Sequence, residues 1–178
     1  MPADLTIFAA NYLVFIEGLV AAALILVLLY RTPRTRIVRW AVAASVLVIV
    51  AYIAAQIGGA IYNDPRPFAA GHFRPLIAHV ADNGFPSDHS LMAAALVAAV
   101  ALARLRWALL VLPLAILVEW ARVGAGLHHP IDVIGSDLCV AVGVLAALLI
   151  APTLTRLVLP LVPGRVLDLV AAPEQMIA

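Results

Sequence analysis

Two residues of the chain have the spacing of a histidine held by a carboxylate. His128 and Asp132 are four residues apart, and Pro130 between them suits the first turn of a helix. Residues four apart on a helix lie on one side, so Asp132 can accept a hydrogen bond from one ring nitrogen of His128. The other nitrogen is then free for attack or proton transfer. The alternative is a helix start stabilised by Asp132, with unrelated loop histidines.

A second histidine, His89, follows a proline and a predicted helix cap. Ser87 comes after Pro86 and suits the N-cap position of a helix. The unpaired backbone amides of the first turn, including that of Asp88, would then form an anion site. His89 would lie beside this site and could move a proton there. The alternative is an ordinary capped helix with an interfacial histidine.

Two arginines are candidates for binding a phosphate. Arg66 stands between two prolines, which restrict its backbone, and Arg122 precedes His128 by six residues. A guanidinium can hold a phosphate through two parallel hydrogen bonds. The alternative for Arg66 is a stiff turn whose side chain reaches lipid headgroups.

The composition indicates what must position these residues. Of 178 residues, 65% are hydrophobic and only 12% are charged, which excludes a disordered chain and a nucleic-acid-binding arm and favours an integral membrane protein. Five apolar stretches are predicted as spanning helices. They cover residues 12–30, 37–61, 87–105, 107–120 and 131–151.

The predicted fold is therefore an all-α bundle of five transmembrane helices in one membrane domain, residues 1–178. Residues 3–11 could extend the first helix or lie at the interface. The proline-containing tail, residues 152–178, fits an interfacial helix or a frayed end better than a sixth span.

The arginines predict the orientation of this bundle. Eight lie on one side of the predicted membrane and three on the other, and the positive-inside rule places the larger group in the cytoplasm. The larger group is Arg31, Arg34, Arg36, Arg39, Arg104, Arg106, Arg156 and Arg165. The loops 62–86 and 121–130 then face outward, and all five histidines lie on that outer face, four in these loops and His89 at the start of the span 87–105.

The sequence predicts no metal site and no cofactor. There is one cysteine, Cys139, and no pair of histidines has the HExxH spacing of a zinc enzyme. His72 and His79 are accordingly interpreted as loop residues rather than zinc ligands.

The order and spacing of these residues resemble the type 2 phosphatidic acid phosphatase (PAP2) superfamily. Its pattern is a lysine, six residues and Arg-Pro, then Pro-Ser-x-His, then Ser-Arg, five residues, His, three residues and Asp. The resemblance covers residues 59–132 and is carried by Arg66-Pro67, by Pro86-Ser87-Asp88-His89, and by Arg122, His128 and Asp132. Two positions depart from the pattern: Gly59 stands for the lysine and Ala121 for the serine.

Within the superfamily the chain looks most like the bacitracin-resistance type of undecaprenyl pyrophosphate phosphatase. The similar stretches are 79–89 and 122–133. This resemblance implies an enzyme of the bacterial plasma membrane, with an outward-facing site that removes the terminal phosphate of a polyprenyl pyrophosphate. It also implies catalysis without a metal.

The residues support a covalent mechanism for such a reaction. His128 would attack phosphorus and form a phosphohistidine, Asp132 would orient it, and His89 would protonate the leaving group. The predicted phosphate-binding residues are Arg66, Arg122, Ser87 and Asp88. Two alternatives stay open: another lipid phosphate as substrate, such as phosphatidylglycerophosphate or phosphatidate, and a lipid transporter without hydrolysis.

Overall fold

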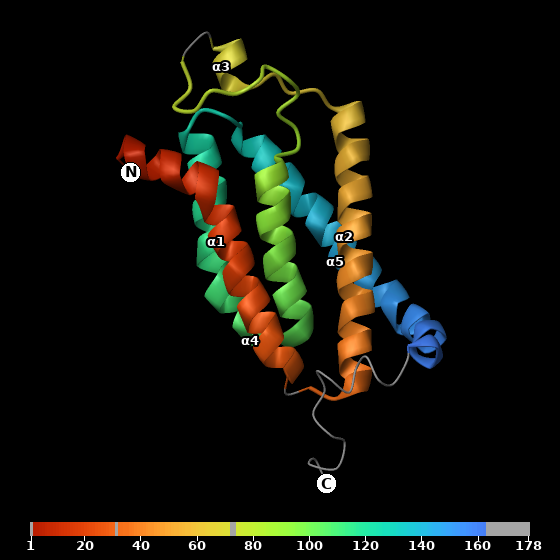
Figure 1. Ribbon diagram of the computed structural model, residues 1–178. Coiled ribbons are helices and arrows are strands. Elements are labelled where there is room, and N and C mark those ends of the chain that lie inside the picture. Colours follow the sequence, from red (N-terminus) through yellow and green to blue (C-terminus); the bar gives the residue numbers. More distant parts are fainter. Residues whose placement is uncertain (1, 31, 72–73, 163–178) are drawn as a thin grey trace.

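A computed structural model describes residues 2–30, 32–71 and 74–162 of the chain (Figure 1). These residues form helices and connecting loops and no β-strand, as the composition predicts. The helices are α1 (Ala3–Tyr30), α2 (Arg34–Ile61), α3 (Pro67–Ala70), α4 (Asp88–Gly124), α5 (Pro130–Val158) and the 3-10 helix η1 (Leu159–Leu161). Four of these, α1, α2, α4 and α5, are long and apolar enough to cross a membrane.

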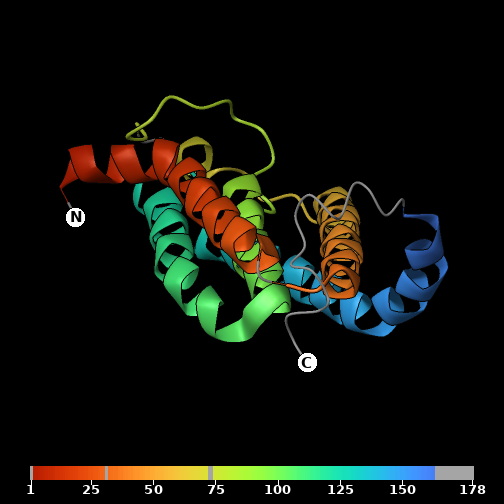
Figure 2. The same ribbon diagram turned by 60° about the horizontal axis from the view of Figure 1, so that its bottom comes forward.

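The longest helix, α4, consists of two legs that join at Arg104. The backbone of Arg104 is extended, with φ −162° and ψ 105°, and the chain turns back there (Figure 2). Side chains of the two legs pack together as in a hairpin: Ala93 shares a buried cluster with Val118, and Val100 shares another with Val111. The two legs correspond to the predicted spans 87–105 and 107–120, so the described residues make five apolar passes.

Small residues let the helices pack closely. α1 packs along α4, and α2 packs along α5. A Cβ atom on Gly143 of α5 would lie 2.5 Å from the carbonyl oxygen of Leu47 in α2. Glycine is therefore required where these two helices cross, as is common in membrane bundles.

Three predicted boundaries differ from the structure. Helix α1 begins at Ala3 rather than residue 12. Helix α5 runs through Pro152 to Val158, because proline is tolerated in a spanning helix whose neighbours satisfy the freed backbone groups. A sixth span could only lie in the tail, of which residues 163–178 are outside the described part of the chain.

The third difference concerns Arg122. The predicted outward loop 121–130 is shorter in the structure, because α4 continues to Gly124 and α5 begins at Pro130. The helix ends where Gly126 adopts a left-handed backbone with φ 73°. Arg122 therefore lies in the last turn of α4 rather than in a loop, which gives its side chain a rigid base.

One end of the bundle collects the loop 62–87, the short segment between α4 and α5, and the first turns of both helices (Figure 1). The three polar blocks of the sequence, around Arg66, Ser87 and His128, all lie at this end, as the predicted spans require. Arg36, Arg39, Arg104 and Arg156 belong to the opposite end. The predicted site residues are therefore gathered on one side of the bundle.

Candidate active site

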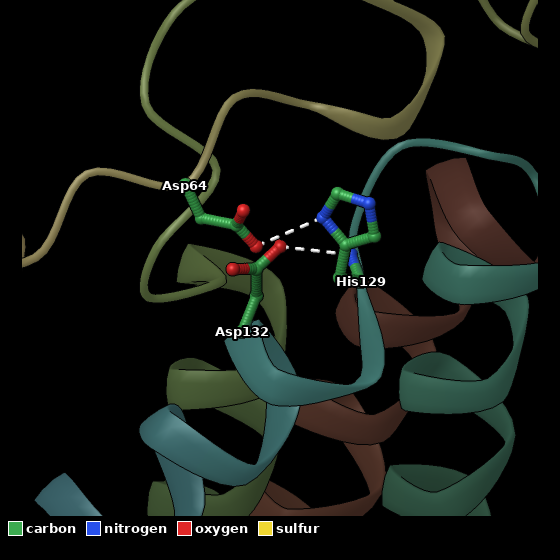
Figure 3. Close-up of side chains that lie close together, drawn as sticks. All are labelled: Asp64, His129 and Asp132. Atoms are coloured by element: carbon green, nitrogen blue, oxygen red, sulfur yellow. Dashed lines mark hydrogen bonds and ion pairs between the residues drawn. The ribbon is translucent and has the colours of Figure 1, made fainter. Parts of the chain in front are cut away.

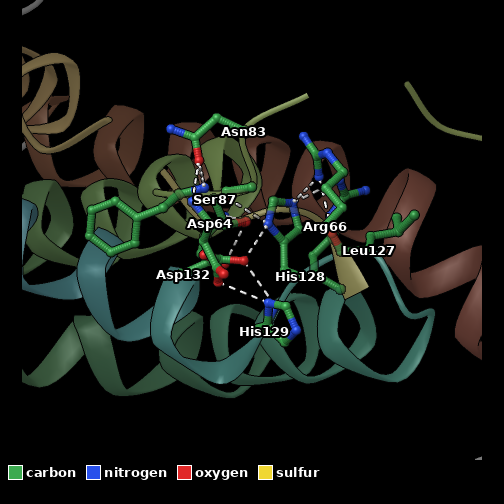
Figure 4. A network of polar contacts seen from close by, with 12 residues as sticks. Asp64, Arg66, Asn83, Ser87, Leu127, His128, His129 and Asp132 are labelled. Atoms are coloured by element: carbon green, nitrogen blue, oxygen red, sulfur yellow. Dashed lines mark hydrogen bonds and ion pairs between the residues drawn. The ribbon is translucent and has the colours of Figure 1, made fainter. Parts of the chain in front are cut away.

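His128 is at the centre of a buried polar network at this end of the bundle (Figure 4). Its side chain is 3% exposed. Nδ1 lies 2.9 Å from the carbonyl oxygen of Gly84 and 3.3 Å from Oδ2 of Asp132. The second contact is the one that the four-residue spacing predicts.

The other ring nitrogen of His128 meets two arginines. Nε2 lies 3.1 Å from Nη1 of Arg66 and 3.4 Å from Nη2 of Arg122. A guanidinium can only donate, so Nε2 must accept with its lone pair, and the ring proton belongs on Nδ1. Nδ1–H then donates to Gly84 and Asp132. The ring is thereby held in the tautomer that leaves Nε2 nucleophilic.

The surroundings also keep the ring of His128 neutral. Burial lowers its pKa below the ordinary value of 6.5, and the charges of Arg122 and Arg66 lower it further. The hydrogen bond and charge of Asp132 act in the opposite direction without reversing the result. His128 is therefore uncharged at neutral pH, as an attacking nitrogen must be.

Arg66 is fixed on two sides. Its side chain is buried, its Nε donates to Oδ1 of Asp82 at 2.5 Å, and its Nη1 donates to the carbonyl oxygen of Leu127 at 3.1 Å. Asp82 belongs to the loop 62–87 and is more than half exposed. The sequence did not single out Asp82 as a partner, because nothing in the spacing of residues 66 and 82 indicates contact.

Arg122 is anchored by the first helix. It is 4% exposed, and its Nη1 donates to the carbonyl oxygen of Ala10 in α1 at 3.3 Å. Its buried Nε–H has no hydrogen-bond partner among the described residues. A buried donor without an acceptor is costly, and it suggests that a ligand oxygen completes this site.

Asp132 is fully buried and bonded to the backbone that precedes it. Its Oδ2 accepts a hydrogen bond of 2.8 Å from the backbone amide of His129, while its Oδ1 has no partner among the described residues. Nδ1 of His129 lies 2.8 Å from Oδ2 of Asp64 (Figure 3). Asp64, His129 and Asp132 offer ligand atoms within 4.8 Å of one another, so they are the described residues best placed to hold a metal ion.

Asn83 holds the loop that supplies the Gly84 carbonyl. Its side-chain oxygen accepts from the amides of Asp64 and Phe85, at 2.9 and 3.0 Å, and its nitrogen donates to the carbonyl oxygens of Gly59 and Tyr62. Sequence reasoning missed Asn83 and Gly84 as site residues. The only local signal was the Asn-Gly pair, which is typical of a turn but not of a particular partner.

The first turn of α4 places the second predicted block. Ser87 is the N-cap, but its hydroxyl is fully buried and accepts from the amide and hydroxyl of Ser90. Asp88 is exposed, and its carboxylate would repel a phosphate, so only its backbone amide suits anion binding. His89 is half-buried and lies near enough to Arg122 and His128 for their charges to act on it.

The two departures from the family pattern have local explanations. A Cβ on Gly59 would lie 3.1 Å from the carbonyl oxygen of Phe85, so α2 packs against the loop where the pattern has a lysine. Ala121 is fully buried in an apolar cluster with Ala9, Ala10, Ala125 and Leu127. Neither position contributes a polar side chain to the site, although the Gly59 carbonyl oxygen accepts from Asn83.

Comparison with known proteins relates this geometry to a family. The profile of the PAP2 superfamily matches residues 39–157. A protein of Bacillus licheniformis named bacitracin transport permease protein BcrC is 32% identical over 151 residues, covering 84% of this chain and 70% of that protein. Undecaprenyl-diphosphatase BcrC of Bacillus subtilis (strain 168) is 34% identical over 130 residues, covering 71% of this chain and 66% of the relative. No solved structure matches the chain.

Proposed function

The chain belongs to the PAP2 superfamily, and from this membership and its site we propose that it is a membrane lipid phosphatase acting on undecaprenyl pyrophosphate. The terminal phosphate would be released, leaving the monophosphate of the lipid carrier used in cell wall synthesis. The multi-pass bundle suits a lipid substrate, since the polyprenyl tail can stay in the bilayer. We place the protein in a bacterial plasma membrane with the site facing outward, on the strength of its arginine distribution.

One observation carries the proposal: two buried guanidiniums converge on one nitrogen of a neutral histidine. Arg66 and Arg122 both contact Nε2 of His128 and repel each other. A phosphoryl group between them would relieve this repulsion and satisfy the free Nε–H of Arg122. The phosphorus atom would then lie next to Nε2, with charge stabilised where it develops.

The reaction would proceed in two steps. Nε2 of His128 forms a bond to the terminal phosphorus as the bond to the bridging oxygen breaks, and His89 gives a proton to the departing lipid phosphate. Asp132 and the Gly84 carbonyl stabilise the positive ring. Water, activated by His89, then attacks the phosphohistidine, breaks the P–N bond and releases inorganic phosphate.

The proton-transfer role of His89 gives a test by leaving group. We expect His89→Ala to lower kcat on undecaprenyl pyrophosphate by about 10²- to 10³-fold, the usual contribution of general acid catalysis. A phosphate ester with an acidic leaving group needs no proton for the first step. For such an ester, His89→Ala should therefore lower the rate of the burst of leaving-group release far less than it lowers kcat on undecaprenyl pyrophosphate. An equal loss of the first step for both substrates would contradict the assignment.

The neutral state of His128 sets the acid side of the pH profile. Since burial and the two arginines lower the pKa of His128 below 6.5, kcat/KM should stay high at pH 6.5 and fall only at lower pH, where the ring becomes protonated. Steady-state assays in one detergent between pH 4.5 and 8 would measure this. If kcat/KM already begins to fall above pH 7 as the pH is lowered, the free ring of His128 is charged at neutral pH, which would contradict this expectation.

We propose that catalysis needs no metal, because two arginines supply the positive charge that a metal would otherwise bring. Phosphate release should be unchanged within about two-fold by excess EDTA, with a zinc phosphatase as the control for chelation. A loss of activity that added divalent ions restore would contradict the proposal. The Asp64–His129–Asp132 group would then be the first place to look for the ion.

Side-by-side turnover would identify the substrate. Purified protein should release phosphate faster from undecaprenyl pyrophosphate than from phosphatidylglycerophosphate or phosphatidate. All three present a terminal phosphoryl group to the cradle, but the leaving group is a phosphate in the pyrophosphate and an alcohol in the two glycerol lipids. Their ranking therefore reports the leaving group as well as contacts outside the phosphate cradle. A preference for a glycerol-based lipid would retain the phosphatase and replace its substrate.

A lipid transporter is the second candidate, and one observation favours it. Glu17 lies in the middle of α1, is fully buried, and has no hydrogen-bond partner for either carboxylate oxygen among the described residues. Transporters place such ionisable residues near the membrane midplane. The cluster around His128 lies at helix ends instead, which favours the enzyme. Reconstituted vesicles separate the two, since a transporter would move lipid without releasing phosphate.

A further inference from the structure

A large cavity lies at the end of the bundle opposite His128. Its volume is about 670 Å³, and its wall is formed by the end of α1, the start of α2, the bend of α4 and the later part of α5. The proposed reaction uses none of these residues. The polar and aromatic residues of the wall are Thr32, Arg36, Arg39, Trp40, Arg104 and Trp107.

Within the described part of the chain, the wall of the cavity carries positive charge and no carboxylate. Three of the lining residues are arginines, Arg36, Arg39 and Arg104, which come from two helices and are exposed. None of the lining residues that the structure describes is Asp or Glu. Guanidiniums that line an open cavity can bind a phosphate through paired hydrogen bonds.

The remainder of the wall is apolar. Val27, Leu102 and Leu148 are among the lining residues. Two tryptophans, which are amphipathic, also line the cavity. The Trp40 ring is fixed, because its Nε1–H donates to the carbonyl oxygen of Ala99 at 2.9 Å. Tryptophan is enriched at the level of lipid headgroups, where one side of the ring is apolar and the other is wet.

We propose that this cavity binds the headgroup phosphate of an anionic phospholipid in the leaflet opposite the active site. The three arginines hold the phosphate, and the apolar wall receives the first carbons of the acyl chains. A free phosphate ion would leave that apolar wall in contact with water, so the charge and the apolar surface together favour a lipid. Basic cavities between spanning helices are known sites for such headgroups.

The two tryptophans of the cavity allow a direct binding test. The chain has three tryptophans, and Trp120 lies in the second leg of α4, outside the cavity. A Trp120→Phe protein therefore reports from Trp40 and Trp107 alone. In phosphatidylcholine vesicles, we expect phosphatidylglycerol with brominated chains to quench this fluorescence at least about tenfold more efficiently, per added lipid, than brominated phosphatidylcholine.

Matched variants test whether the arginines of the wall cause this preference. Arg36→Gln with Arg39→Gln should abolish most of it. Arg106→Gln with Arg156→Gln removes the same charge from the same end but outside the cavity, and should retain the preference. Phosphate release depends on the other end of the bundle and should be unchanged in all variants. Helical circular dichroism should be unchanged as well, because the fold is retained.

Three results would overturn the proposal. The first is equal quenching by the two brominated lipids, and the second is equal loss of preference in both pairs of variants. The third is displacement of brominated phosphatidylglycerol by millimolar inorganic phosphate alone, which would make the site one for free phosphate. None of these results depends on whether the protein hydrolyses undecaprenyl pyrophosphate.

Discussion

His128→Asn should reduce kcat for phosphate release by at least about 10⁵-fold, because a group that forms the covalent intermediate has no substitute. Asparagine retains approximate size and polarity, and its amide can still donate to the Gly84 carbonyl. The asparagine side chain has no nitrogen lone pair of comparable nucleophilicity to place between Arg66 and Arg122. The loss should therefore appear in kcat, while substrate affinity falls much less.

His79→Asn is the matched control for this variant. His79 lies in the loop 62–87 at the same end of the bundle, and its exposed ring makes one hydrogen bond among the described residues, with the carbonyl oxygen of Val80. It should retain nearly full activity. Turnover by His128→Asn within tenfold of the parent would show that another group, or water, attacks the phosphorus.

Arg122→Gln should lower kcat/KM by about 10³-fold or more, the range that a transition-state arginine supplies in phosphoryl transfer. Arg122 contacts both the Ala10 carbonyl and Nε2 of His128, through different nitrogens, and its Nε–H has no partner among the described residues. Lysine places its charge at one point and cannot make this set of contacts. Arg122→Lys should therefore recover less than a tenth of the lost activity.

Folding must be monitored for this second prediction, because the changed group is buried. A retained melting temperature and helical content would assign the loss to the reaction. Arg74→Gln, an exposed arginine of the same loop region, should remain active. Full recovery by Arg122→Lys would indicate that the site needs only a positive charge and not the shape of a guanidinium.

The membrane bundle could be predicted because hydrophobic length is a property of the chain itself. The bend at Arg104 also had a local signal, since two arginines interrupt an apolar run of residues. The position of Arg122 on a helix was missed, because an arginine and two glycines, Gly124 and Gly126, follow Trp120 and together resemble a loop. Gly124 and Gly126 indicate that a helix ends nearby. They do not indicate at which residue it ends, because that depends on tertiary packing.

The site was predicted only where its contacts are local in the sequence. His128 and Asp132 are close in sequence, so helix geometry alone brings them together. The Gly84 carbonyl comes from 44 residues away, and the Asp82 partner of Arg66 belongs to an irregular loop. Such contacts depend on how separate segments pack, and no periodicity in the chain records them.

The covalent role of His128 can be tested directly by trapping the intermediate. Protein mixed with undecaprenyl pyrophosphate labelled with ³²P in its terminal phosphate, and quenched within milliseconds, should carry label that is stable in base and lost in acid. The label should be absent from His128→Asn and present in His79→Asn. Full turnover of the parent protein without any labelled protein, or equal labelling of His128→Asn, would contradict the phosphohistidine mechanism.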